Sequence, residues 1–285
     1  GDVSYLDDPS MSEVIAEIDS YDAIFTNPNK SKVFIGKEVL DAAKNLKVIC
    51  TASTGTNHID KVYAAQLGLP ILALTEEREV ISRISSTAEL AFALTLACLR
   101  HVVRSHNDAL NGQWDYTQYI GRQMNCLTVG VVGYGRLGAM YANYCKAFGS
   151  RVLVYDPHKA IEDNALERVD ELEKLLSDSD VVALHVHVTD ETYEMIDKNA
   201  LRKMKGNVVL INTSRGDIVN ESDLVNFIKK NPDCRVGTDV LADEVRNRLA
   251  SPLLAYAEKS EQVIVTQHIG GMTKDAQVIA YGHAA

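Results

Sequence analysis

The sequence predicts an α/β fold made of two doubly wound parallel-sheet domains. Between residues 126 and 268, short runs rich in β-branched residues alternate with segments of helical periodicity. These runs lack the alternation of apolar and polar residues that a half-exposed strand has, which is typical of parallel strands buried on both faces. A second alternation of the same kind fills residues 1 to about 85. Two regions of helix-covered parallel sheet are therefore expected.

Six strands are predicted in the larger region, which is the number expected for a doubly wound sheet. They cover residues 128–132, 151–155, 181–186, 208–212, 235–240 and 263–266. The helices predicted between them cover residues 137–147, 169–176, 197–204 and 222–229.

In the first region, strands are predicted at 23–26, 48–51 and 71–74, with helices at 12–18 and 37–43. A long helix is expected to begin near Ser86, because Ser86 and Glu89 have the S-x-x-E spacing of a capping box. Its predicted end is at Asn111 and Gly112. The apolar run Leu90 to Leu99 suits a buried core helix and is too short to span a membrane.

The composition fits a globular protein of one large or two ordinary domains, with 285 residues, 46% apolar and 24% charged. The net charge of −10 argues against a nucleic-acid partner. The five cysteines stand singly, without metal-ligand spacing, so no metal site is expected. They fit buried side chains in a reducing cytosol, and the N-terminus carries no signal-peptide pattern, so a cytoplasmic protein is expected.

A cofactor site is predicted where Gly133, Gly135 and Gly138 form G-x-G-x-x-G between a strand and a helix. The first glycine makes the tight turn, the second lets the backbone approach a pyrophosphate, and the third lets helix and strand pack closely. Exposed amides and the positive end of the helix dipole then hold the phosphates.

Asp156 ends the next predicted strand, 18 residues after Gly138. A carboxylate there accepts hydrogen bonds from the ribose hydroxyls of the adenosine and repels a 2′-phosphate, so NAD is preferred over NADP. The alternative is a glycine-rich turn followed by an incidental surface aspartate.

Three polar clusters follow later strands, at the sheet edge where ligands bind in open α/β sheets. They supply Arg215, Glu244 and His268. Arg215 would hold a substrate carboxylate and polarise the C2 oxygen with its planar fork. His268 would exchange the proton of a 2-hydroxyl, and Glu244 would orient His268 and stabilise its charged form. Taken singly, each residue also fits a structural or solvated role.

Over nearly its whole length the sequence resembles the D-isomer-specific 2-hydroxyacid dehydrogenase family, which includes phosphoglycerate dehydrogenases and hydroxypyruvate reductases. The segments that carry the resemblance are the loop 53–60, Thr87-Ala88-Glu89, Trp114, the glycine motif, Leu184-His185, the cluster 212–216 and the segment 266–271.

The resemblance implies NAD-dependent interconversion of a D-2-hydroxy acid and its 2-oxo acid. Arg215, Glu244 and His268 fall on the catalytic positions, with His268 the proton donor during reduction. The loop Ser53-Thr54-Gly55 would offer backbone amides to the substrate carboxylate. The positions expected to contact the cofactor are Thr87, Gly133, Gly135, Arg136, Leu137, Gly138, Asp156, His185, Thr213, Ser214 and Asp239, the last facing the nicotinamide amide.

The family's topology implies that a Rossmann NAD-binding domain, residues 91–269, is inserted into a flavodoxin-like substrate domain formed by residues 1–90 and 270–285. The active site is then expected in the cleft between domains, and the protein as a homodimer joined through the cofactor domain. One strand and one helix of the first domain are expected to be absent from this sequence.

Four positions depart from the family's pattern, and none removes a reacting group. His187, Val245 and Gln267 stand where proline is usual, and Asn220 stands for aspartate. The His187 side chain would either line the cofactor cleft or be solvated.

Two other functions compete with a dehydrogenase. One is a non-catalytic NAD-sensing protein, as in related corepressors, for which an Arg-Glu-His set is unnecessary. The other is different chemistry on the same scaffold, such as formate or phosphite oxidation, against which Glu244 argues.

The substrate itself is not predicted. Arg78, Arg83, His58 and Lys61 lie near cleft-facing motifs, where they would bind a second acid or a phosphate or serve as surface charge. Our hypothesis is that Arg83 contacts a distal anionic group of the substrate.

Overall fold

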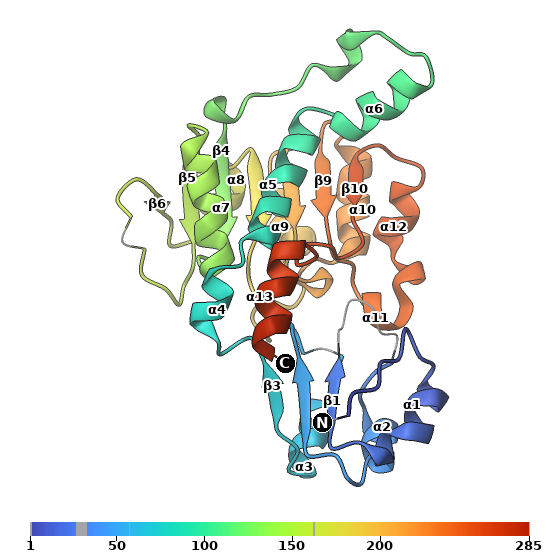
Figure 1. The fold of residues 1–285 in the computed structure, drawn as a ribbon. Coiled ribbons are helices and arrows are strands. Elements are labelled where there is room, and N and C mark those ends of the chain that lie inside the picture. Colours follow the sequence, from blue (N-terminus) through green and yellow to red (C-terminus); the bar gives the residue numbers. More distant parts are fainter. Residues whose placement is uncertain (1, 27–32, 57, 162, 285) are drawn as a thin grey trace. The chain divides into compact units, whose positions relative to one another are not determined.

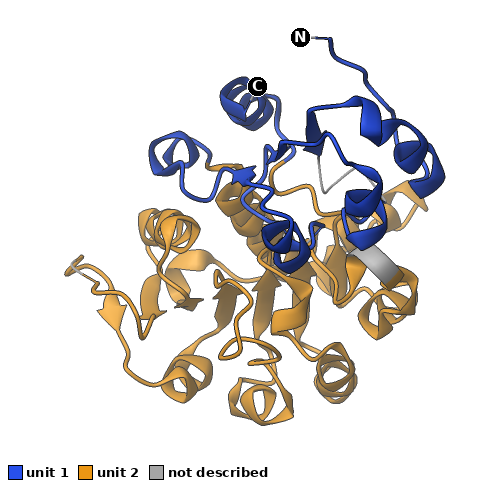
Figure 2. Cartoon of the chain, turned by 90° about the horizontal axis from the view of Figure 1, so that it is seen from below, with its two compact units in different colours: residues 1–84, 272–285 blue, residues 85–271 orange. Residues whose placement is uncertain are grey.

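The structure is a computed structural model that describes residues 2–26, 33–56, 58–161 and 163–284, with only the backbone of Val245 and Arg246. The chain divides into unit 1, residues 1–84 with 272–285, and unit 2, residues 85–271 (Figure 2). The boundaries lie six residues before and two after the expected ones, 90 and 269. The first shift has a clear cause, because helix α5 (Ser86–Leu99) packs as a whole on the sheet of unit 2.

Unit 2 is organised around a seven-stranded parallel sheet with the order β10-β9-β8-β7-β4-β5-β6 (Figure 1). All six predicted strands are present, and β6 adds a seventh at the edge. Strand order reverses between β4 and β7, which is the switch point where such sheets bind ligands. The strands are β4 (Thr128–Val132), β5 (Arg151–Tyr155), β6 (Glu167–Arg168), β7 (Val181–Leu184), β8 (Val209–Asn212), β9 (Arg235–Thr238) and β10 (Val263–Val265).

Both faces of this sheet are covered by helices. Successive side chains of a strand point to opposite faces, so the apolar strands present apolar side chains to the helices on each face. Val129 and Val131 belong to one core cluster with α5 and α7, and Val132 belongs to the other cluster. The second cluster contains side chains of α8, α9, α10 and α12. The bounds of the helices are α7 (Arg136–Ala147), α8 (Leu172–Asp178), α9 (Lys198–Lys203), α10 (Glu221–Lys230) and α12 (Pro252–Ala257).

The single long helix predicted from Ser86 to residue 111 is wrong. The chain instead forms α5 and α6 (Val102–Leu110), separated by His101 in the left-handed conformation with φ of +53°. A left-handed residue commonly ends a helix, because it turns the chain away from the helix axis. The predicted capping box is also absent: Ser85 is the N-cap, and its hydroxyl donates to Glu89 Oε1 at 2.5 Å.

The helical stretch Arg78–Leu99, which contains α4 and α5, is long and apolar enough to cross a membrane by length and composition alone. Within it, α5 buries seven side chains, among them Ala88, Ala91 and Leu94, and contacts β8 and β9. Such packing is that of a core helix, as the sequence predicted for Leu90 to Leu99.

Unit 1 contains a parallel sheet with the order β1 (Ala23–Thr26), β2 (Val48–Thr51) and β3 (Ile71–Ala73). Its C-terminal helix packs against α4, where His283 pairs with Glu77 at 3.0 Å. Both ends of the chain therefore contribute to unit 1. Its helices are α1 (Met11–Glu17), α2 (Lys37–Ala42), α3 (Lys61–Gln66), α4 (Arg78–Ser82) and α13 (Lys274–Ala284), of which only the first two were predicted.

Candidate active site

The glycine loop between β4 and α7 has the steric properties that the sequence predicts. Gly133 has φ of +91°, which L-residues rarely adopt, and a Cβ on it would lie 2.6 Å from the carbonyl oxygen of His185. A Cβ on Gly138 would lie 2.0 Å from the carbonyl oxygen of Gly133. Gly135, the N-cap of α7, faces open space. The loop therefore packs tightly on the sheet and leaves room beside Gly135 and the helix N-terminus, which suits a pyrophosphate.

Asp156 closes this loop from the neighbouring strand. Its Oδ2 accepts a hydrogen bond from the backbone N–H of Tyr134 at 2.8 Å, and its Oδ1 accepts one from the N–H of His158 at 3.0 Å. Each carboxylate oxygen has two lone pairs, so both keep capacity for a further donor such as a ribose hydroxyl. Asp156 is thus placed beside the glycine loop as predicted.

His185, directly after β7, lies beneath the glycine loop. Neither ring nitrogen has a hydrogen-bond partner among the residues that the structure describes, and the ring centroid lies 5.0 Å from that of Tyr141. Burial lowers the pKa of His185 to about 4. The side chain is therefore a neutral imidazole that packs against the glycine loop. Its predicted contact with the cofactor stays a prediction.

Other predicted cofactor residues surround the same edge. The Thr213 hydroxyl is buried without a partner in the described part of the chain, which is the kind of polar atom that a bound molecule satisfies. Ser214 donates its hydroxyl to the carbonyl of Leu184 at 2.6 Å. Arg136 and Leu137 open α7, and burial lowers the pKa of Arg136. These residues fit a dinucleotide cofactor.

Arg215 follows β8 in a loop that Asn212 shapes. The Asn212 side chain accepts from the N–H of Ser214 at 3.0 Å and donates to the carbonyl of Arg215 at 2.8 Å. Burial lowers the pKa of the Arg215 guanidinium, while the carboxylates of Glu244 and Asp217 oppose that shift. The Arg215 charge is thus desolvated and lies within electrostatic reach of Glu244.

Glu244 and His268 form a hydrogen-bonded pair across two loops. Nδ1 of His268 lies 2.5 Å from Oε1 of Glu244, and the other Glu244 oxygen accepts from the N–H of Leu241 at 3.1 Å. Because Nδ1 faces a carboxylate, Nε2 is left for substrate, with no hydrogen-bond partner among the described residues. Glu244 begins the short helix α11 (Glu244–Asn247). The 32% exposure of His268 leaves its ring accessible to a substrate.

Asp239, at the end of β9, anchors the loop that carries His268. Its carboxylate is 1% exposed and accepts from the Thr266 hydroxyl at 2.5 Å. The N–H groups of Ile269 and Gly270 also donate to it, both at 2.8 Å. A Cβ on Gly270 would meet both Asp239 and Thr87. Thr87, another predicted cofactor residue, therefore lies against the loop that carries His268. The predicted contact of Asp239 with the nicotinamide amide stays a prediction.

Gly216 brings the Arg215 loop against the Glu244 loop. A Cβ there would lie 1.9 Å from the carbonyl carbon of Leu241 and 2.2 Å from the nitrogen of Ala242. The two backbones therefore touch where no other residue fits. The structure thus brings Arg215, Glu244 and His268 to one edge of the sheet.

Comparison with known proteins identifies the family of this chain. Residues 92–270 match the family model for the "D-isomer specific 2-hydroxyacid dehydrogenase, NAD binding domain". Hydroxypyruvate reductase of Thermotoga maritima is 31% identical over 278 residues, which are 96% of this chain and 84% of the relative.

The chain belongs to the D-isomer-specific 2-hydroxyacid dehydrogenase family.

Two further relatives extend this result. D-3-phosphoglycerate dehydrogenase of Archaeoglobus fulgidus is 35% identical over 94% of this chain, although this chain spans only 49% of that relative. The crystal structure of D-lactate dehydrogenase from Aquifex aeolicus, complexed with NAD and lactic acid, matches with a TM-score of 0.79 at 29% identity and covers 94% of this chain and 82% of that one. The predicted family, α/β fold with a Rossmann domain, NAD cofactor and oxidoreductase class are confirmed.

The loop Ser53 to Gly55, which was predicted to bind the substrate carboxylate, belongs to unit 1. The N–H of Gly55 donates to Ser53 Oγ at 3.0 Å, and the carbonyl of Thr54 accepts from the Thr75 hydroxyl at 2.9 Å. The Gly55 amide is thus engaged within its own loop, and its predicted role toward a substrate stays a prediction. Asn57 lies outside the described residues.

The departures from the family pattern are accommodated locally. Asn220 caps α10 by accepting from the N–H of Asp223 at 3.0 Å, which an aspartate would also do. His187 is exposed, and its carbonyl accepts from the Thr192 hydroxyl at 2.5 Å. The side chain of Val245 lies outside the described part.

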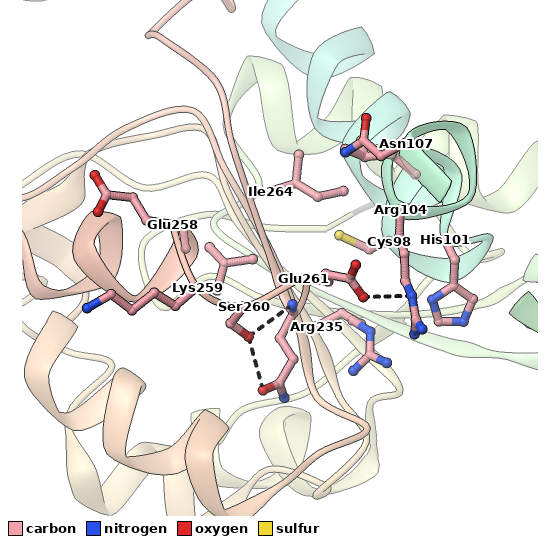
Figure 3. A pocket seen from close by; sticks show the side chains of 15 residues that line it. Cys98, His101, Arg104, Asn107, Arg235, Glu258, Lys259, Ser260, Glu261 and Ile264 are labelled. Carbon is pink, nitrogen blue, oxygen red and sulfur yellow. Dashed lines mark hydrogen bonds and ion pairs between the residues drawn. The ribbon is translucent and has the colours of Figure 1, made fainter. Parts of the chain in front are cut away.

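A pocket of about 310 Å³ lies at the opposite edge of the unit 2 sheet, where β9 and β10 begin. Figure 3 shows Arg104 and Glu261 paired across it, at 2.6 Å, with His101 and Arg235 alongside. No predicted site residue lines this pocket, so it is not the dehydrogenase site.

Proposed function

We propose that this chain interconverts a small D-2-hydroxy acid and its 2-oxo acid. The observation that carries the proposal is the Glu244–His268 pair, which leaves Nε2 of the imidazole free, with a desolvated Arg215 within electrostatic reach of Glu244. When bound, NAD supplies the hydride that reduces the 2-oxo carbon or accepts it in the reverse direction. The hydroxypyruvate reductase and the D-lactate dehydrogenase reported above have names that refer to small hydroxy or oxo acids, which supports the proposal.

During reduction, His268 donates the Nε2 proton to the carbonyl oxygen as the C=O π electrons move onto that oxygen, so that a hydroxyl forms. In the reverse direction Nε2 takes that proton back as the general base. Glu244 holds the ring through Nδ1 and stabilises its positive charge. Arg215 binds the substrate carboxylate and polarises the reacting oxygen.

The test is loss of NADH absorbance with a panel of 2-oxo acids that includes glyoxylate, hydroxypyruvate and pyruvate. Wild type should turn over at least one of them, and His268→Ala should lower kcat by ~10²–10⁴-fold. The matched control is His106→Ala, an exposed residue of α6, which should keep wild-type activity. NADH binding without turnover of any acid would instead support the NAD-sensing alternative.

A homodimer is part of the proposal. Figure 1 shows α6 and the segment after it projecting from the rest of unit 2. This projection exposes large apolar side chains, among them Leu110 at 75%, Trp114 at 89% and Ile120 at 75%. Exposed apolar surface of this kind marks an interface. Sedimentation velocity should give a dimer for wild type and a monomer for Trp114→Ala combined with Ile120→Ala.

We also propose that the protein functions in the cytosol and away from membranes. The five cysteines are all free, which suits a reducing compartment. Cell fractionation with an antibody to the protein tests both points.

A further inference from the structure

Glu221, the first residue of α10, is 6% exposed, and the hydrogen bonds of its carboxylate go to Ala242 and Ser251 rather than to Arg215, Glu244 or His268. One oxygen accepts a hydrogen bond from the N–H of Ala242 at 2.8 Å, and the other accepts from the Ser251 hydroxyl at 2.6 Å. Burying a carboxylate is costly unless hydrogen bonds compensate it. The N-terminus of α10 adds favourable electrostatics. This buried charge therefore has a defined task, which is to hold those two groups.

Ala242 lies two residues before Glu244, in the loop that presents Glu244 to His268. Leu241 donates its N–H to Glu244 itself, and Asp243 has φ of +50°. A left-handed residue other than glycine persists only where its surroundings fix it. Since the Leu241 bond is internal to the loop, the Ala242 bond to Glu221 is the tie that fixes the loop to α10.

The peptide between Leu241 and Ala242 also packs against Gly216. The atoms of that peptide lie so close to Gly216 that a single added carbon would collide with them. Movement toward the Arg215 loop is thus blocked by contact with Gly216, and the hydrogen bond to Glu221 fixes the direction of the Ala242 N–H.

We propose that Glu221 is a positioning residue that fixes the loop 241–243 and thereby keeps Glu244 on Nδ1 of His268. This inference rests on the proposed function. Without Glu221, the Asp243 conformation relaxes and the Glu244 carboxylate moves relative to the imidazole. The proton donor then loses its partner, whereas Arg215 keeps its own loop and continues to bind the substrate carboxylate.

A purely structural role makes a different prediction. Glu221 also joins α10 to α12 through Ser251, whose hydroxyl accepts from the N–H of Leu254 at 3.0 Å. Ser251→Ala removes that tie and leaves the Ala242 bond in place. Asp223 is a matched control on the same turn of α10, because its carboxylate accepts from the N–H of Lys198 at 3.0 Å and so holds α9 rather than the loop.

The first experiment compares kcat, KM for the 2-oxo acid and the pH profile of kcat/KM among variants. For Glu221→Ala we expect kcat to fall roughly ten- to a hundred-fold, since small displacements at a reacting centre have effects of that size. KM should stay near wild type. The pH at which the proton donor is lost should move lower, because an imidazolium without its carboxylate gives up its proton more easily.

Glu221→Gln should retain most activity, because its amide oxygen still accepts from Ala242. Ser251→Ala and Asp223→Ala should keep the wild-type pH profile. An unchanged pH profile in Glu221→Ala, or an equal shift in Ser251→Ala and Asp223→Ala, would overturn the inference. If Glu221→Ala does not fold, Glu221→Asp replaces it in the comparison. This variant keeps the charge, but its carboxylate is one methylene shorter, so we expect the same shift of the pH profile.

The second experiment needs no turnover. The proton of His268 Nδ1, shared with Glu244, should give a low-field NMR resonance that is absent from Glu244→Ala. We expect this resonance in wild type and Glu221→Gln and its loss in Glu221→Ala; persistence in Glu221→Ala would refute the inference. A wild-type protein that reduces no 2-oxo acid would refute the proposed function alone, and the NMR result would still decide the role of Glu221.

Discussion

His268 and Glu244 are 24 residues apart in the sequence, yet their side chains meet at 2.5 Å between two loops. Both loops contain a residue with positive φ, Asp243 in one and His268 itself in the other. Such conformations cost of order 1–3 kcal/mol each and cluster at functional sites. The hydrogen bond between Glu244 and His268 therefore joins two strained loops, and its geometry depends on the contacts that hold each of them.

Glu244→Gln tests the charge of this pair without changing its shape. We expect kcat to fall roughly ten-fold or more, because the glutamine no longer stabilises the charged imidazole. The pH limb of kcat/KM that reports the proton donor should move to lower pH. The control is Glu258→Gln, an exposed residue beside the pocket at the other sheet edge, which should leave both quantities unchanged.

Gly216→Ala tests the contact between the Arg215 and Glu244 loops. The added carbon would lie 1.9 Å from Leu241, so the loops must separate. We expect a loss of stability of about 1–3 kcal/mol, together with a fall in kcat. Urea unfolding and steady-state kinetics measure the two effects. Gly282→Ala is the control, because Gly282 lies within α13 with nothing near its Cβ position, and alanine there should not destabilise the protein.

Asp156→Asn separates two roles of one carboxylate. Asparagine can still accept from the N–H of Tyr134, so the glycine loop keeps its shape. Its neutral side chain should bind the ribose hydroxyls more weakly and repel a 2′-phosphate less. We expect NADH affinity to fall roughly ten-fold, the size of a charge-assisted hydrogen bond, and NADPH affinity to rise. Titration calorimetry measures both, and unchanged NADH affinity would contradict the assignment of Asp156.

His185 makes the stability of unit 2 sensitive to mild acid. The pKa of His185 falls from the ordinary 6.5 to about 4 on folding. Between these two pH values the imidazole is therefore protonated in the unfolded chain and neutral in the folded chain. The contribution is fully present above pH 6.5 and is lost as the pH falls toward 4, amounting to about 3 kcal/mol. His185→Gln should therefore flatten the fall of unfolding free energy between pH 6.5 and pH 5, whereas His106→Gln should not.

Arg83→Ala tests recognition of a distal anion. Arg83 is an exposed residue at the end of α4, so its loss should not affect stability. If it contacts a phosphate, KM for a phosphorylated 2-oxo acid should rise more than KM for the unphosphorylated acid. Arg78→Ala, on the same helix, is the comparison, and equal effects of Arg83→Ala on both substrates would reject the hypothesis.

The buried strands were predictable because a short apolar run between turn signals is typical of a strand that is buried on both faces. Strands 128–132 and 151–155 were predicted with their observed bounds. The edge strand Glu167–Arg168 was missed, since its two residues are exposed and polar. The break at His101 was also missed, because nothing in its residue type announces a left-handed conformation.

The candidate site was predictable only in part. Arg215, Glu244 and His268 follow separate strands, and their positions in the sequence pointed to one edge of the sheet. The anchoring contacts of Asp239, Gly216 and Glu221 could not be predicted, because each joins residues about 20 to 30 positions apart through the packing of particular loops. A glycine directly after Arg215 was the one local signal of such a contact.

The close contact at Gly216 limits which substitutions this protein can accept during evolution. Since the backbones of residues 216 and 241–242 touch, neither loop tolerates an insertion or a larger residue at that point without moving the other. The Arg215 loop and the Glu244 loop are therefore expected to evolve together, because a substitution in one needs a compensating substitution in the other. New substrate preferences should therefore arise through substitutions elsewhere in the chain, while the spacing of the reacting groups stays fixed.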